Sequence, residues 1–291
     1  TDSTVKRISK MNFDEIIALD KADPLAQKRL EFDLPVNTIY LDGNSLGALP
    51  KSVKSKVAEV VSKQWGNDLI KSWNSHNWIA LPIRGGEKIA PIIGAAKGQV
   101  ICCDSISVNL FKLLCSALTL NSERTVVLST KDNFPTDLYM VQGLSDLLGP
   151  DLCQLQMVEE QNIEQSLNES VAVLLLTQVN FRTGNLLDMA KLTKLAHEKG
   201  ILVIWDLAFV YVAKRHQDAV KQPLSGWMGH SKPFAFNPEY QAASNINQFQ
   251  CGTPSVISMS VLDAALDVWQ DVDMLQIRTK SMELAEVFLQ L

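Results

Sequence analysis

The middle of the chain alternates short apolar runs with segments of helical periodicity. Four runs rich in valine, leucine and isoleucine have the length and composition of strands: residues 100–103, 125–129, 171–179 and 201–207. The first three are each followed by a helical pattern, over residues 108–118, 136–148 and 189–197. Strands that are apolar on both faces are typical of parallel sheets covered by helices. The pattern therefore predicts a doubly wound α/β fold with a mainly parallel sheet.

Helical periodicity also marks the two flanks of this region. Residues 11–32 and 51–65 are expected to be helical, and so are residues 261–291. From these patterns we expect three parts along the chain. They are an N-terminal segment (1–50) that contributes to a small domain and an interface, a large domain (51–260), and a helix (261–291) that leads into a partial second, small domain.

Composition narrows the class of protein. A net charge of -5 argues against a nucleic-acid partner and against an anionic membrane surface. No stretch has the length and apolar character of a membrane span. The cysteines form no CxxC pair, which is typical of free thiols in a reducing compartment, so we expect a cytoplasmic protein. These cysteines are Cys102, Cys103, Cys115, Cys153 and Cys251.

Several familiar chemistries are excluded by their missing motifs. The sequence has no GxxxxGK[ST] phosphate loop and no GxSxG nucleophile turn, and the glycines at 85–86 and 94–98 lack dinucleotide-binding spacing. The histidines stand apart from one another and from the cysteines at ligand spacing, so no metal site is expected. They are His76, His197, His216 and His230.

Asp206 is the most informative single residue, because it is the one carboxylate in the apolar run 203–208. Ligands of open α/β sheets bind at the carboxyl ends of the strands. A buried, unpaired aspartate is unfavourable unless a cation compensates its charge. We therefore expect a positively charged group to face Asp206.

Other strand ends carry further candidate residues. Ser107 lies at the start of the predicted helix 108–118, where backbone N–H groups can bind phosphate, although an N-cap role would place a serine there equally well. Phe134 follows the run 125–129, and its ring could stack on a planar cofactor or fill the core. Thr177 is either a site residue at a strand end or simply a β-former.

A series of segments, taken in order along nearly the whole chain, closely resembles the kynureninases, which are pyridoxal-phosphate enzymes of the aspartate-aminotransferase fold type (fold type I). These segments are residues 40–47 (YLDGNSLG), 106–111 (ISVNLF), 133–137 (NFPTD), 179–184 (VNFRTG), 205–208 (WDLA), 223–230 (PLSGWMGH) and 251–254 (CGTP). The resemblance implies the fold of this class and pyridoxal 5'-phosphate as cofactor.

The resemblance also implies roles for individual residues. Asp206 would be the anion at the cofactor's pyridinium nitrogen. Ser45 and Asn67 would touch substrate, and Trp227, which could also be a core residue, would approach the phosphate. The cofactor-binding residues so implied are Ile106, Ser107, Phe134, Pro135, Thr136, Asp137, Thr177, Asp206, Trp227 and Thr253.

The activity implied by the resemblance is hydrolysis of L-kynurenine to anthranilate and L-alanine in tryptophan catabolism, on the kynurenine pathway to NAD. The sequence does not decide between kynurenine and 3-hydroxykynurenine, whose product would be 3-hydroxyanthranilate. A homodimer with active sites at the subunit boundary is implied too. The only other partner expected is the small-molecule substrate.

The expected lysine is not found in this sequence. Fold-type I enzymes bind the cofactor through a lysine, which kynureninases carry a few dozen residues after the aspartate strand, in a motif similar to Tyr-Lys-Tyr-Leu-Asn. Here Phe209 follows Ala208 directly, and Lys214 matches a later basic residue of the family. The substrate-carboxylate arginine of the C-terminal small domain is not found either. We therefore assign no catalytic residue.

Three interpretations remain open. The complete enzyme carries a lysine segment between Ala208 and Phe209, or the chain is a catalytically inactive scaffold that acts as a binding protein, or it is another fold-type I enzyme such as a cysteine desulfurase. Parallel neighbouring strands need a crossover of about a dozen residues or more, which favours the first. On that interpretation Ala208 and Phe209 lie further apart than the ~3.8 Å of a peptide link. Asp206 then faces an open cleft beside Phe134 and Thr177.

Overall fold

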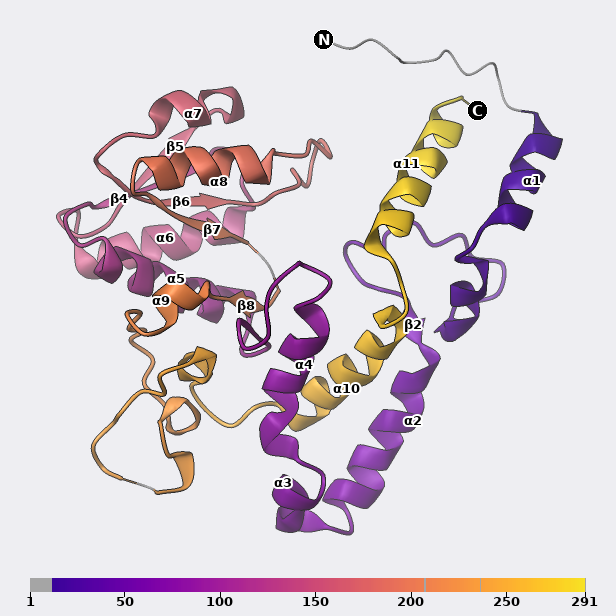
Figure 1. Ribbon diagram of the computed structural model, residues 1–291, viewed down its shortest axis with the longest axis horizontal. Coiled ribbons are helices and arrows are strands. Elements are labelled where there is room, and N and C mark those ends of the chain that lie inside the picture. The colour runs from indigo at the N-terminus through magenta and orange to yellow at the C-terminus, as the bar shows by residue number, and fades with distance from the viewer. Residues whose placement is uncertain (1–11, 207, 236, 291) are drawn as a thin grey trace. The chain divides into compact units, whose positions relative to one another are not determined.

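The computed structural model describes residues 12–206, 208–235 and 237–290, which form two compact units (Figure 1). The sheet unit comprises residues 82–255. The terminal unit combines residues up to 81 with those from 256 onward. No helix in the described ranges is long and apolar enough to cross a membrane.

A parallel four-stranded sheet forms the centre of the sheet unit, as the apolar runs predicted, with the strand order β5-β4-β6-β7. The strands are β4 (Val126–Thr130), β5 (Gln154–Val158), β6 (Val171–Leu176) and β7 (Leu202–Trp205). β5 was not predicted. It lies at the sheet edge and is partly exposed, so its residues Gln-Leu-Gln-Met-Val mix polar and apolar side chains.

Helices cover both faces of this sheet, which confirms the doubly wound α/β fold (Figure 1). They are α5 (Ile106–Leu120) and α6 (Pro135–Leu148) on one face, and α7 (Ile163–Ser166) and α8 (Met189–Glu198) on the other. Along β6, Val173 and Leu175 pack toward α5 and α6, whereas Leu174 and Leu176 pack toward α7 and α8. Every residue of β6 is therefore buried, which explains why its sequence is continuously apolar.

The prediction that residues 100–103 form a strand of the parallel sheet is wrong. β3 (Val100–Ile101) has only two residues and pairs antiparallel with β8 (Val210–Tyr211) in a separate two-stranded sheet. The strand cannot continue through Asp104, whose backbone is left-handed with φ of 49°. Phe249 and Ile246 share one buried cluster with Ile101 of β3 and Val210 of β8.

The remaining segments of the sheet unit are short helices and turns. They are α4 (Leu81–Ile89), α9 (Lys214–Gln217) and the 3-10 turns Glu160–Asn162, Trp227–Gly229, Pro233–Ala235 and Ile246–Phe249. Gly86 of α4 lies so close to the carbonyl of Val100 that an added Cβ would stand 2.1 Å from its oxygen. This glycine therefore permits α4 to pack directly on β3.

The terminal unit is mainly helical, as predicted for both flanks. Its helices are α1 (Phe13–Ala22), α2 (Lys51–Glu59) with a π-helical continuation Val60–Trp65, α3 (Ser72–Ser75), α10 (Val256–Leu266) and α11 (Met274–Gln290). Three-residue or longer 3-10 turns join them at Ala26–Glu31, Leu69–Lys71, Trp78–Ala80 and Asp267–Trp269. A two-residue antiparallel pair, β1 (Phe32–Asp33) and β2 (Leu49–Pro50), completes this unit.

The two units divide the chain differently from the three parts expected. Residues 51–81 belong with the terminal segments rather than with the sheet, because α2 packs along α10. The Ser52 hydroxyl donates a hydrogen bond to the carbonyl of Ala264, and Val53 and Val60 are buried. A burial pattern alone does not tell which neighbour covers an amphipathic helix.

Candidate active site

Three strand ends of the sheet unit bring four polar residues together. Asp206 follows β7, and its N–H donates to the carbonyl of Leu176 at the end of β6. Thr177 is the next residue after β6, and Asn133 and Asp137 come from the loop after β4 and the first turn of α6. The sequence placed Asp206, Thr177 and Asp137 in one site, and the structure gathers them at the carboxyl edge of the sheet.

Hydrogen bonds join these strand ends into one network. The N–H of Thr177 donates to Oδ1 of Asn133 over 2.7 Å, and Nδ2 of Asn133 donates to Oδ2 of Asp137 over 2.9 Å. The Thr177 hydroxyl donates more weakly to the same Asp137 oxygen, over 3.4 Å. Asn133 is 4% exposed and holds the site together. Sequence reasoning gave it no role, although it begins the segment 133–137 that carries the resemblance.

Asp137 and Asp206 form an electrostatically unfavourable pair. Burial, and after it the neighbouring Asp206 carboxylate, raises the pKa of Asp137 to about 6. Burial also raises the pKa of Asp206. Each carboxyl group has a buried Oδ1 that accepts no hydrogen bond. Two orphaned carboxylate oxygens side by side are suited to a ligand that brings a positive charge and an N–H donor.

The described residues do not supply the cation expected at Asp206. No described side chain pairs with Asp206, and burial alone accounts for its raised pKa. A partner for this carboxylate therefore has to come from a bound molecule or from residues beyond those described.

An exposed aromatic ring stands at the start of α6, next to this network. Phe134 is the residue that precedes α6 and is 44% exposed, so it is not a core residue. Its ring meets that of Phe181 edge-on, with 5.3 Å between centroids. Pro135 and Thr136, in the first turn of α6, are half-buried behind it. The ring of Phe134 thus has one aromatic neighbour and stays partly exposed, so it is accessible to a planar ligand.

The N-terminus of α5 has a different cap from the one considered for Ser107. Ser105 is the N-cap, and its hydroxyl accepts a hydrogen bond from the N–H of Val108 over 3.4 Å. Ile106 and Ser107 form the first turn, ahead of the first helical hydrogen bond from Asn109 to Ser105. Their N–H groups have no acceptor within the helix and can bind an anion there.

Trp227 and Thr253 lie on two segments that are packed tightly together. Gly226 sits against the backbone of Cys251, where an added Cβ would stand 1.8 Å from the carbonyl oxygen. Trp227 follows in a 3-10 turn, is half-buried and packs edge-on against Phe234. Thr253 is exposed. Contact between these segments needs a glycine at 226, which the sequence supplies inside the segment 223–230.

The two candidate substrate residues belong to the terminal unit. Ser45 donates its hydroxyl to Oδ1 of Asp42 over 2.7 Å, and Asn67 follows the π-helical end of α2. Their roles in substrate binding stay predictions, and so does the open cleft expected beside Asp206.

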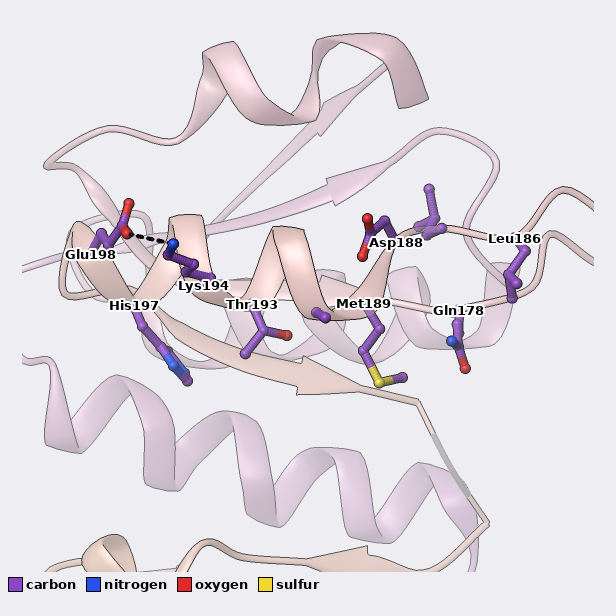
Figure 2. A pocket seen from close by; sticks show the side chains of 10 residues that line it. Gln178, Leu186, Asp188, Met189, Thr193, Lys194, His197 and Glu198 are labelled. Atoms are coloured by element: carbon purple, nitrogen blue, oxygen red, sulfur yellow. Dashed lines mark ion pairs between the residues drawn. The ribbon is translucent and has the colours of Figure 1, made fainter. Parts of the chain in front are cut away.

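Two neighbouring hollows lie on other parts of the sheet unit. One, of about 600 Å³, is bordered by the edge of β7 (Leu202–Trp205), by Phe209 and Tyr211 at β8, and by α5. The other, of about 1180 Å³, is an open trough along α8 and is shown in Figure 2. Gln178, Met189, Thr193 and His197 line both. β7 and β8 are the last strands of their sheets, so each turns an unpaired edge to the smaller cavity.

Comparison with known proteins agrees with this fold. The family model described as aminotransferase class-V matches residues 39–222. The kynureninase of Deinococcus radiodurans is 43% identical over an alignment of 316 positions, which covers 95% of this chain and 76% of that protein. The kynureninase of Burkholderia pseudomallei (strain 1106a) is 41% identical, covering 96% of this chain and 76% of its own length.

Solved structures share the fold at low sequence identity. The cysteine desulfurase CsdA from Escherichia coli aligns with a TM-score of 0.71 at 18% identity, covering 90% of this chain and 75% of that one. An apo cysteine desulfurase from Thermococcus onnurineus aligns with a TM-score of 0.64 at 16% identity, covering 89% and 71%. At such identities the likeness shows the fold alone.

The fold and the family model define the class: this is a fold-type I enzyme of the aminotransferase class-V group. Within that class, the chain belongs to the kynureninase family. One feature of the alignment bears on the missing lysine. The alignment to the Deinococcus protein spans 316 positions and this chain has 291 residues, so at least 25 positions of the relative have no counterpart here.

Proposed function

We propose that the protein hydrolyses L-kynurenine, or its 3-hydroxy form, to anthranilate, or 3-hydroxyanthranilate, and L-alanine, with pyridoxal 5'-phosphate as cofactor. One observation carries the proposal. In a chain 43% identical to a kynureninase, the carboxylate of Asp206 has a buried Oδ1 that no group of the described residues satisfies. The protonated nitrogen of a pyridine ring would satisfy it.

The residues present fit this cofactor. Asp206, supported by Asp137, would hold the ring nitrogen, and the exposed ring of Phe134 would stack on the cofactor. The N–H groups of Ile106 and Ser107 at the start of α5 would bind the phosphate. Trp227 and Thr253 would approach the phosphate from the packed pair of segments beside it. When bound, the ring supplies an electron sink for the bonds being broken.

The protein's own contribution at this end of the site is to keep one proton in place. A carboxylate at Asp206 would favour a protonated ring nitrogen, because its Oδ1 is buried and no described cation competes for it. Asn133 fixes Asp137 through Oδ2, which leaves the buried Oδ1 of Asp137 without a partner and available to the same charge. The Thr177 N–H is occupied by Asn133, which leaves only its hydroxyl to adjust to a ligand.

We infer that the complete enzyme carries a further segment between Ala208 and Phe209, and that this segment supplies the lysine. Two observations support this inference. The alignment requires at least 25 positions that this chain lacks. In addition, the cavity of about 600 Å³ between the unpaired edges of β7 and β8 could take an additional strand. Lys214, exposed at the start of α9, is not a substitute.

The raised pKa values of the cysteines argue against the cysteine desulfurase alternative. A sulfur-accepting cysteine needs an accessible thiol with a lowered pKa. Here burial raises the pKa of Cys102 to about 12, and the pKa values of Cys103 and Cys153 to about 11. Burial raises the pKa values of Cys115 and Cys251 as well. None of the five has the properties of a reactive loop cysteine.

The proposal also includes the protein's location, its oligomeric state and its metabolic pathway. Five unpaired cysteines support a reducing, cytoplasmic location. The large apolar side chains of Val36, Ile39 and Leu41 are more than four-fifths exposed and would be covered in a homodimer. The proposed reaction belongs to tryptophan catabolism.

One activity assay with three substrates distinguishes the three interpretations. The complete protein is mixed with pyridoxal 5'-phosphate and, in separate samples, with L-kynurenine, 3-hydroxykynurenine and L-cysteine. A hydrolase of the proposed kind forms anthranilate or 3-hydroxyanthranilate, detected by fluorescence. A desulfurase instead releases sulfur from cysteine, and an inactive scaffold leaves all three substrates unchanged. Either of the last two results would overturn the proposal.

A further inference from the structure

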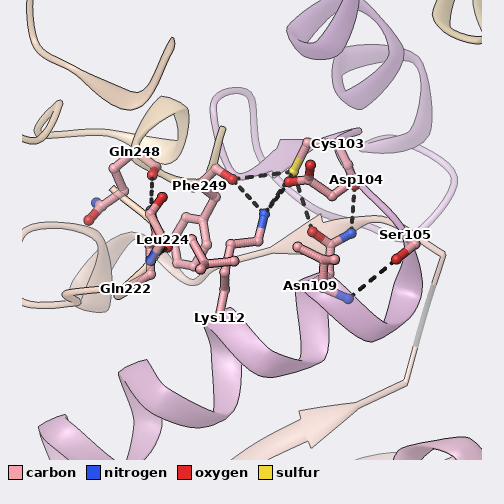
Figure 3. Close-up of polar contacts among 10 residues, drawn as sticks. Cys103, Asp104, Ser105, Asn109, Lys112, Gln222, Leu224, Gln248 and Phe249 are labelled. Carbon is pink, nitrogen blue, oxygen red and sulfur yellow. Dashed lines mark hydrogen bonds and ion pairs between the residues drawn. The ribbon is translucent and has the colours of Figure 1, made fainter. Parts of the chain in front are cut away.

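Among the described residues Lys112 is the one lysine whose side chain is fully buried, and nothing in the proposed reaction uses it. It projects from the second turn of α5, as Figure 3 shows. Its Nζ donates to Oδ2 of Asp104 over 2.6 Å and to the carbonyl of Phe249 over 2.6 Å. A third, longer contact reaches Sγ of Cys103 at 3.6 Å.

The groups around Lys112 are tied to each other as well. The amide of Asn109 donates to the carbonyl of Cys103 over 2.7 Å and, through Oδ1, accepts from the Cys103 thiol. That thiol also approaches the carbonyl of Phe249. Asp104 has a left-handed backbone at this point, with φ of 49°, a conformation that is uncommon for residues other than glycine.

These contacts connect the two segments that carry the proposed phosphate ligands. Asp104 immediately precedes Ser105, the cap of the turn that contains Ile106 and Ser107. Phe249 precedes Cys251, against which Gly226 is packed and beyond which Thr253 lies. The Lys112 ammonium thus joins the start of α5 to the segment 249–253.

Lys112 has no donor left for a ligand. An ammonium has three N–H donors, and Asp104, Phe249 and Cys103 take all three. Lys112 is fully buried, whereas the Asp104 side chain is 29% exposed. Such a pair is weak evidence for stability, because taking the ammonium out of water offsets much of its attraction to the carboxylate. What such a pair does provide is a fixed geometry between the elements that it joins.

We propose that Lys112 is a positioning residue for the phosphate end of the cofactor site, acting by holding the start of α5 against the segment 249–253. The inference rests on the proposed cofactor site. It concerns a residue that has no direct contact with the cofactor. Its effect should therefore be confined to ligands that carry a phosphate.

The test compares three ligands on the wild-type protein and the Lys112→Met variant. Pyridoxal 5'-phosphate, pyridoxal without the phosphate, and inorganic phosphate are titrated separately, with tryptophan fluorescence and the shift in melting temperature as readouts. We expect Lys112→Met to bind both phosphate-containing ligands about tenfold more weakly, the size of one lost charge-assisted hydrogen bond. The affinity for pyridoxal should be unchanged.

A second variant covers the case in which Lys112→Met does not fold. The double change Asp104→Asn with Lys112→Met removes both charges, so that Asp104 is not left as a carboxylate without its cation. It should melt near the wild-type temperature and still bind the two phosphate-containing ligands more weakly than wild type. Lys112→Arg should recover part of the lost affinity for these ligands. Lys97→Met, a change of an exposed lysine in the same unit, is the matched control and should bind all three ligands normally.

The outcomes separate the inference from the proposed function. If the folded double variant binds phosphate and pyridoxal 5'-phosphate as tightly as wild type, Lys112 has no positioning role. If the variants lose pyridoxal binding to the same extent, the effect is general destabilisation, and the inference is overturned too. If the wild-type protein binds none of the three ligands, the proposed cofactor site is contradicted. The inference about Lys112, which rests on that site, is then contradicted as well.

Discussion

The side-chain oxygen of Asn133 accepts the backbone N–H of Thr177, and this 2.7 Å hydrogen bond joins the loop after β4 to the end of β6. The other end of the same amide holds Asp137. One buried side chain therefore fixes both the strand end and the carboxylate that supports Asp206. The geometry of the carboxylate pair depends on it.

Replacing Asn133 with alanine should lower the free energy of unfolding by about 1–3 kcal/mol, because the Thr177 N–H and the Asp137 carboxylate would both lose a buried partner. Urea denaturation measures this loss. Thr177→Val is the matched comparison, since it keeps the backbone N–H and removes only the hydroxyl at 3.4 Å. Equal losses for the two variants would contradict the role assigned to Asn133.

The raised pKa of Asp137 predicts a particular dependence of stability on pH. Its pKa is about 6 in the folded protein, against 3.8 for an ordinary aspartate. Between these values the folded state binds the proton more tightly than the unfolded state, so stability is retained at low pH and falls as pH rises toward 6. Without cofactor, the protein should resist urea better at about pH 4 than at about pH 7 through this group.

Asp137→Asn should reduce that fall, because the neutral side chain has no proton to lose. Asp146→Asn, a change of an exposed aspartate on the same helix, is the control and should leave the fall intact. A pH dependence that is the same in Asp137→Asn and wild type would show that Asp137 does not titrate in this range.

Asp206→Ala should stabilise the cofactor-free protein but weaken cofactor binding and turnover. Without cofactor the variant should melt at a higher temperature, because a buried and unpaired carboxylate is gone. With pyridoxal 5'-phosphate it should bind the cofactor more weakly, and in the complete enzyme turnover should fall below about a tenth of wild type. Absorbance titration and anthranilate fluorescence check the two effects. Turnover above that limit would exclude the assigned role.

Peptide mapping tests the inferred lysine segment. Trypsin cleaves after Lys199 and Lys214, so the printed sequence yields one peptide from Gly200 to Lys214 that spans the junction. For the protein expressed from its own gene we expect this peptide to be absent and to be replaced by peptides with additional residues, one of them containing the lysine. The intact mass should then exceed 32.3 kDa. Recovery of the printed peptide would favour the inactive scaffold.

The proposed homodimer can be tested by sedimentation. The exposed apolar residues Val36, Ile39 and Leu41 should be covered in a dimer whose interface is large and apolar. We therefore expect a dimer at micromolar concentration. A fully active monomer at that concentration would contradict both the dimer and the placement of active sites at a subunit boundary.

The sequence predicted strands and site residues correctly where burial produces a recognisable pattern among neighbouring residues. β6 is buried on both faces, so its six residues are all apolar, and Asp206 stands out because a carboxylate ends a similar run. β5 was missed because an edge strand is partly exposed and mixes polar with apolar residues. The pairing of β3 with β8 could not be predicted, because it joins residues more than a hundred positions apart.

The parts of the site that the sequence did not predict depend on distant partners. Asn133 acts on a residue 44 positions away, and Lys112 acts on a carbonyl 137 positions away. An asparagine in a loop and a lysine in a helix are ordinary surface residues by composition. Only the folded chain shows that both are buried and what each one holds.

The central claim, hydrolysis at the ketone of kynurenine, is tested most directly by running the reaction in water labelled with heavy oxygen and analysing the products by mass spectrometry. The account predicts anthranilate and L-alanine in equal amounts, with oxygen from the labelled water in the anthranilate carboxylate and none in alanine. Unlabelled anthranilate, or a folded, cofactor-loaded and complete protein that releases no anthranilate, would contradict it.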